Sequence, residues 1–152
     1  VVADIMNTNP YTLPATAKIR DAIAIMKETE TNGVPLLDEA NQVVGFLSDG
    51  DILKYLARHE SSQTDGLSYI IMLETDSFQE RIRAVYDLNV MRLATKSVIT
   101  VDANEQADLA FRTLSDKKIK KAPVVKDGKL VGTLSRRNIM KALDIMEQAI
   151  EA

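Results

Sequence analysis

The chain has 152 residues, of which 45% are hydrophobic and 27% charged, with a formal net charge of −3, no cysteine and one histidine. These proportions are typical of a folded globular protein with a substantial core. The lack of cysteine excludes disulfides, thiolate nucleophiles and cysteine-based zinc sites, and one histidine cannot form a histidine cluster.

The charge is divided unevenly along the chain. Residues 1–88 hold 7 basic and 14 acidic side chains, whereas residues 89–152 hold 12 basic and 8 acidic ones. Such a division either steers an acidic ligand toward the second half or helps the two halves to dock on each other. There is no apolar run of about 20 residues and no basic stretch followed by an apolar one at the N-terminus. These features predict neither a membrane span nor a secretion signal, and hence a cytoplasmic protein.

The elements predicted for the first half recur in the second half. The first half contains an extended segment at 11–13, a helix with N-cap Thr16, strands at 34–37 and 43–47, and a helix after Ser48. The same order of elements recurs 88 residues later up to the proline of the first long strand, and 87 residues later beyond it. The second half thus has an extended segment at 98–101, a helix with N-cap Asn104, strands at 122–125 and 130–134, and a helix after Ser135. Pro35 and Pro123 cannot donate to a ladder, so we expect them at a strand start or on an edge strand.

An insertion separates the two copies. Within it, residues 61–66 are predicted to form a loop, and Ser77 and Glu80 have the spacing of a capping box before a helix at about 78–88. This insertion either covers an edge of the pair or forms an oligomer contact. The interpretation is therefore an α+β fold with β-α-β-β-α repeats at 1–58 and 89–152 and an insertion at 59–88. The two repeats are expected to pack as a closed pair, because a repeated unit usually cannot bury its apolar face alone.

A polar turn ends the last strand of each copy, in GFLSDGD (45–51) and GTLSRRN (132–138). Each turn places a serine where a strand meets the start of a helix. Free backbone amides and the helix dipole favour an anionic or hydroxyl-rich ligand there. The sequence therefore predicts a duplicated ligand site. In the second copy Arg136 and Arg137 place cations beside the serine, where at most one of them is expected to face the ligand and the alternative is a solvated surface pair.

These turns follow the strands NGVPLL and KKAPVV at matching distances, and together the four motifs resemble a tandem pair of CBS (cystathionine β-synthase) domains, called a Bateman module. The resemblance covers the chain outside the insertion. It implies a non-catalytic regulatory module in which the two repeats pack with pseudo-twofold symmetry and form two clefts that bind AMP, ADP, ATP or S-adenosylmethionine. It also implies energy sensing by allosteric regulation, association into a homodimer, and action on an effector domain or partner protein, with no required cofactor and no metal.

Family roles apply where the motifs match. The resemblance implies that Ser48 and Asp51 bind the phosphate side and the ribose of the nucleotide. The alternative for Asp51 is a purely structural role, in which its charge stabilises the first turn of a helix. Asn138 replaces the usual aspartate, so the second cleft is weaker, differently selective or empty, and Asn138→Asp is expected to tighten ribose binding. The full set of predicted ligand-binding residues is Thr12, Gly33, Val34, Pro35, Ser48, Asp51, Thr100, Lys120, Lys121, Ala122, Pro123, Ser135, Arg136, Arg137 and Asn138.

The main alternative is a protein interaction or oligomerisation module with weak or vestigial clefts. Nucleic-acid binding through the lysines at 117–121 is disfavoured by the acidic net charge and the 5% aromatic content. No motif pairs a nucleophile with a base, so the sequence does not predict an enzyme. His59 is interpreted as a solvated residue near a helix end.

Overall fold

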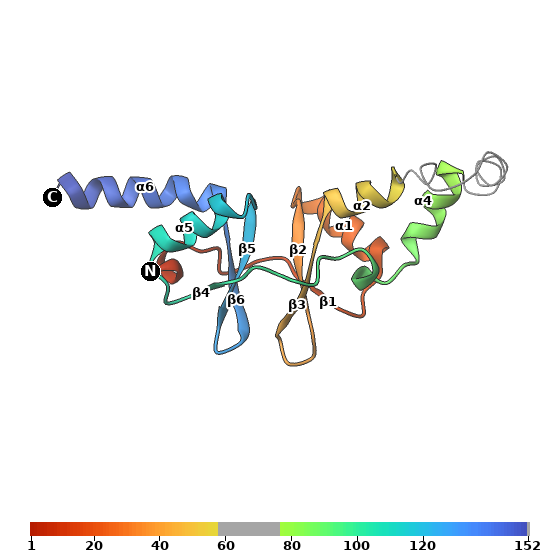
Figure 1. Ribbon diagram of the computed structural model, residues 1–152, viewed down its shortest axis with the longest axis horizontal. Coiled ribbons are helices and arrows are strands. Elements are labelled where there is room, and N and C mark those ends of the chain that lie inside the picture. The colour runs from red at the N-terminus through yellow and green to blue at the C-terminus, as the bar shows by residue number, and fades with distance from the viewer. Residues whose placement is uncertain (58–76, 152) are drawn as a thin grey trace.

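The computed structural model describes residues 1–57 and 77–151. It has an α+β fold with two three-stranded sheets side by side in the middle of the molecule, and the helices of each repeat lie on the outer side of their own sheet (Figure 1). The elements of the first repeat are β1 (Leu13–Pro14), α1 (Ile19–Thr29), β2 (Gly33–Leu37), β3 (Val43–Ser48) and α2 (Asp49–Leu56). Those of the second are β4 (Val101–Asp102), α5 (Ala107–Asp116), β5 (Lys121–Lys126), β6 (Lys129–Ser135) and α6 (Arg136–Glu151). The predicted fold class and the repeated order of elements are confirmed.

The strand order is β1-β2-β3 in one sheet and β4-β5-β6 in the other, so the first strand of each hairpin is the central strand. Pro35 therefore lies inside a central strand, and the prediction of a strand start or edge was wrong. Pro35 is tolerated because parallel pairing with β1 begins only at Leu36, opposite Leu13. On the other side its antiparallel partner Phe46 directs its own N–H and C=O to Thr95, at 2.9 Å each. No ladder bond at Pro35 is lost. Pro123 occupies the matching place opposite Thr133.

The first helix of each repeat begins later than predicted. The N-cap of α1 is Lys18, not Thr16, and that of α5 is Gln106, not Asn104. At α1 the capping group comes from inside the helix, because the Asp21 carboxylate accepts a hydrogen bond of 2.9 Å from the backbone N–H of Lys18. This bond gives the backbone N–H of the N-cap residue a hydrogen-bond partner, although the N-cap is neither serine nor threonine.

The opening segment of each repeat packs on the other repeat. A short 3-10 helix, η1 (Val2–Asp4), contributes the fully buried Val2 to the core of the second sheet, and η3 (Val90–Arg92) contributes Val90 to the core of the first. Each opening segment also pairs with the edge strand of the opposite repeat. Thr95 pairs with Phe46 of β3, and Asn7 pairs with Thr133 of β6. Two core clusters result, and each is completed by residues from the opposite half of the chain, so neither repeat buries its core alone.

Further contacts between the repeats are hydrogen bonds. At the hairpin tips, the backbone N–H of Leu130 donates to the Asn41 carbonyl at 3.1 Å, and the Asn41 side chain donates back to the Leu130 carbonyl at 3.3 Å. The ion pairs between described residues, Val1 with Asp4 and Arg20 with Asp87, both lie within residues 1–88. The unequal charge of the two halves is thus not used to form ion pairs between them in the described part of the chain.

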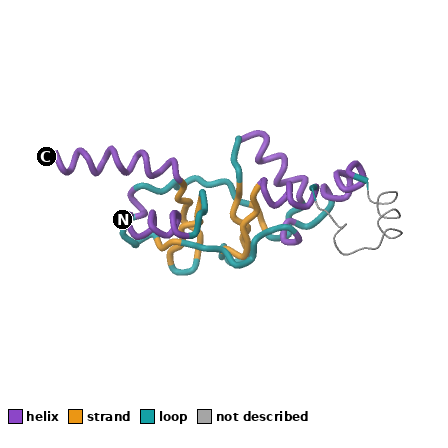
Figure 2. The backbone as a smooth tube through the Cα atoms, turned by 45° about the horizontal axis from the view of Figure 1, so that its top comes forward, coloured by secondary structure: helices purple, strands orange, loops and turns teal. Residues whose placement is uncertain are grey.

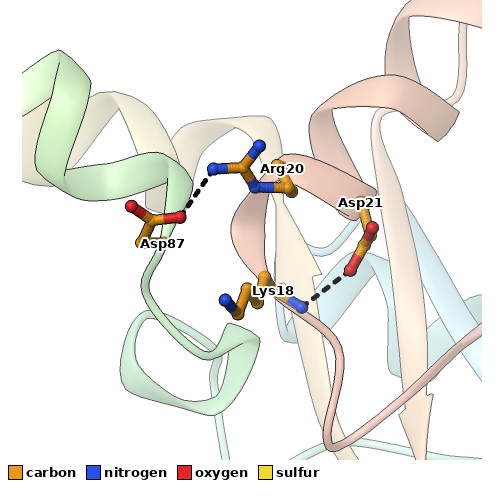
Figure 3. A network of polar contacts seen from close by, with 4 residues as sticks. All are labelled: Lys18, Arg20, Asp21 and Asp87. Atoms are coloured by element: carbon orange, nitrogen blue, oxygen red, sulfur yellow. Dashed lines mark hydrogen bonds and ion pairs between the residues drawn. The ribbon is translucent and has the colours of Figure 1, made fainter.

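Helix α4 (Phe78–Tyr86) belongs to the inserted segment and was predicted at this position. Its N-cap is Ser77, whose hydroxyl accepts a 3.1 Å hydrogen bond from the N–H of Glu80. It packs beside α1 and α2 and buries Val85 in the first core. Arg20 of α1 forms a 2.6 Å ion pair with Asp87 just after α4, next to the Lys18–Asp21 cap (Figure 3). This part of the insertion therefore covers the first repeat. The predicted loop at 61–66 and His59 lie outside the described residues.

Candidate functional site

The polar turn of the first repeat is organised around Asp51. Ser48 ends β3 and is the N-cap of α2; its hydroxyl oxygen accepts from the N–H of Asp51 at 3.2 Å. In return, Oδ2 of Asp51 accepts from the N–H of Ser48 at 2.9 Å. These reciprocal bonds form a capping box and fix the rotamer of the aspartate. Asp51 therefore has a structural role at the start of α2, as the alternative interpretation of the sequence expected.

The capping box leaves half of the Asp51 carboxylate available. Oδ1 accepts no hydrogen bond from the residues that the structure describes, and the side chain is partly exposed. Because the Ser48 hydroxyl acts as an acceptor for Asp51, its own proton also remains available for a further bond. The turn thus presents a carboxylate oxygen and a hydroxyl donor at a strand end.

Gly33 and Lys121 lie beside this turn. Gly33 is the register partner of Ser48, and Lys121, which begins β5 of the other repeat, reaches across to donate from Nζ to the Gly33 carbonyl at 3.4 Å. The Lys121 side chain is about half buried, and this burial lowers the pKa of its ammonium group. No carboxylate within the described residues forms an ion pair with Lys121. A partly desolvated cation without a counterion is a position that an anionic ligand group would stabilise.

The matching turn of the second repeat is bonded differently. Oδ1 of Asn138 accepts from both the N–H and the hydroxyl of Ser135, at 2.7 and 3.0 Å. Its Nδ2 donates to the carbonyl of Ile5 at 2.9 Å. The orientation of the amide follows from its partners, because a backbone N–H only donates and a carbonyl only accepts. Ser135 and Asn138 therefore bond to each other and to the opening segment of the chain.

The remaining predicted residues divide into buried and exposed groups. Val34, Pro35, Ala122 and Pro123 are fully buried, so their side chains are core groups and only their backbone atoms are candidates for ligand contact. Thr12 and Thr100 come directly before β1 and β4, and neither side chain is hydrogen-bonded to the polar turns in the described part of the chain. Lys120, Arg136 and Arg137 are exposed, and the backbone N–H of Arg136 donates to the Lys120 carbonyl at 3.1 Å.

Sequence reasoning missed two residues that shape these turns. The ring of Phe46 occupies the space over Gly33, since an added Cβ there would lie 2.7 Å from Phe46 Cε1. Ile5 supplies the carbonyl that binds Asn138. The 88-residue shift pairs Gly33 with Lys121 and the 87-residue shift pairs Phe46 with Thr133. The alignment of the two repeats therefore indicates that the two turns differ in shape. It does not indicate that Ile5 contacts Asn138.

A shallow pocket lies next to the first polar turn, between α1, the loop after it and the start of α2. It is lined by Ile23, Met26, Lys27, Glu30, Thr31, Asn32, Asp49 and Ile52. None of these is a predicted site residue, but Asp49 belongs to the Ser48–Asp51 turn, so the pocket borders that turn. Among the described residues no cluster of three or more acidic, histidine or cysteine side chains is placed to hold a metal ion. No helix in the same part of the chain is long and apolar enough to span a membrane.

The chain belongs to the CBS domain family. The family model matches residues 2–58 and 87–145, which places one CBS domain in each repeat. The resemblance inferred from the four strand and turn motifs is therefore confirmed.

Individual relatives agree with this assignment. The chain is 30% identical over 139 residues to the chloroplastic CBS domain-containing protein CBSX2 of Arabidopsis thaliana, and the match covers 88% of this chain but only 58% of that protein. It is 25% identical to the uncharacterised protein MJ1426 of Methanocaldococcus jannaschii, with 94% of this chain and 90% of that one covered. The chain spans less than two thirds of the length of CBSX2 and about a quarter of the inosine-5′-monophosphate dehydrogenase of Staphylococcus aureus.

Solved structures share the fold. A structure of CBSX2 in complex with AMP has a TM-score of 0.72 and 27% identity, covering 96% of this chain and 97% of that one. An acetoin utilization protein (AcuB) structure from Vibrio cholerae has a TM-score of 0.75 at 21% identity and covers 99% of this chain and 96% of that one. The latter likeness shows the fold alone.

Proposed function

We propose that this chain is a regulatory module that binds an adenosine-containing ligand at the polar turn of the first repeat. The observation that carries the proposal is the capping box of Ser48 and Asp51, which fixes the carboxylate while leaving Oδ1 without a partner among the described residues. A carboxylate oxygen can accept hydrogen bonds from the vicinal hydroxyls of a ribose, and such charge-assisted bonds are stronger than neutral ones. The AMP complex of the relative CBSX2 supports this ligand class.

Lys121 is proposed to contact the ligand's phosphate or other anionic group. It is the partly buried cation of the second repeat that reaches the start of β2 in the first. A bound anion would compensate the desolvation of the ammonium, and it would bridge both repeats because Asp51 and Lys121 belong to different halves. Ligand binding would then favour the arrangement of the repeats in which both contacts form, which is how a ligand shifts a conformational equilibrium.

Calorimetric titration tests the proposal with AMP, ADP, ATP and S-adenosylmethionine. We expect saturable heat with at least one of them, and we expect Asp51→Asn to weaken that binding. Asp51→Asn is a matched substitution, because Asn138 shows that an amide oxygen at this position still accepts from the backbone N–H of the serine. Absence of heat from all four ligands, with a chain that unfolds cooperatively, would overturn the proposal and favour an interaction module.

We also propose that the module forms a homodimer through α2 and α6. Leu53 and Met140 occupy matching places under the 87-residue shift, and both are largely exposed, at 64% and 70%. The stripe continues along α6 through Leu143, Met146 and Ile150, and Figures 1 and 2 show this helix extending past the second sheet. Pseudo-symmetric apolar faces suit an isologous contact. Sedimentation of the intact chain should give a dimer, which Leu53→Lys with Met140→Lys should dissociate; a monomeric parent chain would contradict the proposal.

A further inference from the structure

The hydrogen-bonding capacity of the two polar turns is unequal, although the turns occupy matching places. In the first, Oδ1 of Asp51 and the proton of the Ser48 hydroxyl have no partner among the described residues. In the second, the Ser135 hydroxyl donates its proton to Asn138, whose oxygen accepts two bonds and whose Nδ2 donates one. A ligand hydroxyl at Asn138 would have to replace bonds of 2.7 to 3.0 Å that the protein already makes.

The bond from Asn138 to Ile5 belongs to a larger anchor. The opening segment buries Val2 completely in the second core, and Asn7 exchanges two backbone hydrogen bonds with Thr133, of 2.9 and 3.0 Å. The segment passes so close to β6 that an added Cβ at Gly132 would lie 2.5 Å from the Asn7 carbonyl oxygen. Asn138 thus ties α6 to a segment that is fixed on both sides of Ile5.

The first repeat cannot form the same tie. The bridges Asn7–Thr133 and Thr95–Phe46 set the register of the two opening segments, in which Leu93 corresponds to Ile5. An ionised carboxylate only accepts hydrogen bonds, so Asp51 cannot donate to the Leu93 carbonyl as Asn138 donates to that of Ile5. The two side chains differ in one atom, a nitrogen in Asn138 and an oxygen in Asp51. Because of this difference Asn138 anchors the opening segment, whereas Asp51 keeps an oxygen that can accept a further hydrogen bond. The backbone of Lys121 pairs with Ser135, but its ammonium is bonded at the first repeat, to the Gly33 carbonyl. Gly33, at the matching position, has no side chain that could reach the second turn in return.

We infer that the chain binds one adenosine ligand, at the first repeat, and that the Ser135–Asn138 turn is an anchor that holds the opening segment on the second repeat. This inference rests on the proposed function, because it assigns that function to one of two matching turns. It removes Ser135 and Asn138 from the ligand-binding residues.

The test is a titration of the intact chain with the tightest-binding of the four ligands, with the stoichiometry per chain as the readout. We expect one ligand per chain, a loss of affinity of about tenfold or more for Asp51→Asn, and affinity within about twofold of the parent for Asn138→Ala. Asn138→Ala should instead speed amide hydrogen exchange at Ile5 and Met6, which a ligand-binding role alone would not do.

Outcomes that overturn the inference differ from those that overturn the proposed function. Two ligands per chain, or an Asn138→Ala chain that keeps its unfolding temperature and hydrogen exchange but loses affinity as strongly as Asp51→Asn, would show that the second turn is a ligand site. Absence of heat from every ligand with the folded parent chain would remove the proposed function, and the inference with it.

Discussion

The two repeats have the same order of elements but use the end of their hairpins for different purposes. In the first, serine and aspartate form a closed capping box that leaves one carboxylate oxygen available. In the second, serine and asparagine are bonded to each other and to Ile5 of the opposite half. A repeated motif therefore does not guarantee a repeated site, because one change from aspartate to asparagine alters which groups can donate.

The largest expected effect comes from the glycines that face the exchanged segments. Gly132→Ala should destabilise the chain by about 3 kcal/mol, since its Cβ would lie 2.5 Å from a backbone oxygen that several hydrogen bonds hold in place. Gly45→Ala is the matched control; its nearest neighbours are side-chain atoms of Met91 and Leu36 at 3.1 and 3.3 Å, which can move, so we expect less than about 1 kcal/mol. Urea unfolding measures both. Equal losses would contradict the difference in packing between the two repeats.

Removal of the Asp51 carboxylate has the next largest effect. Asp51→Ala should weaken ligand binding by about 1.5 to 3 kcal/mol, the range for a hydrogen bond to a charged group. It should also lower the free energy of unfolding by about 1 kcal/mol, because the capping box loses its acceptor for the Ser48 N–H. Calorimetry and thermal unfolding separate the two losses. Asp51→Asn should retain most of the stability but not the affinity, and a chain that keeps both would move the ligand away from this turn.

The opposite substitution, from asparagine to aspartate at position 138, tests the same difference in the second repeat. From the sequence alone, Asn138→Asp was expected to tighten ribose binding, but the structure changes that expectation. The new carboxylate would face the Ile5 carbonyl and lose the bond from Nδ2, so we expect a loss of stability of about 1 to 2 kcal/mol and no additional ligand. Thermal unfolding and titration check this. A second bound ligand in this variant would contradict the anchor role.

The smallest effect concerns Lys121. Burial lowers its pKa in the folded chain, so the unfolded chain holds more protons at this residue as the pH approaches 10.5, the ordinary value for lysine. The contribution of Lys121 to stability therefore rises with pH through that window and is least favourable at lower pH. Lys121→Met should remove this slope, which is small because the group is half exposed. Unfolding free energies of both chains across the window measure it; a parent chain that loses stability there relative to Lys121→Met would have the wrong sign.

Much of the fold followed from patterns local to the sequence. The 87- and 88-residue shifts located both hairpins and both helices of each repeat, and the Ser77–Glu80 spacing located α4. The N-caps could not be predicted in the same way, since the group that caps α1 is the Asp21 carboxylate inside the helix and the N-cap itself is a lysine. Predicting that Pro35 is tolerated in a central strand also requires knowledge of where the pairing with β1 begins.

The site was only partly predictable for a related reason. Ser48 and Asp51 form their capping box within four residues, so the motif was enough to place them next to each other. The bond between Asn138 and Ile5 joins residues separated by 133 positions, and that between Lys121 and Gly33 joins residues separated by 88. Both depend on the exchange of opening segments and the facing of the two sheets, which no local pattern contains.

A crystal structure of the intact chain grown with AMP would show which of the two turns holds the ribose. We expect a ribose whose hydroxyls donate to Oδ1 of Asp51, a phosphate toward Lys121, and an Asn138 amide still bonded to Ser135 and Ile5. A ribose bonded to Asn138, with the Ile5 bond broken and the Asp51 carboxylate in contact with protein or solvent only, would contradict this expectation.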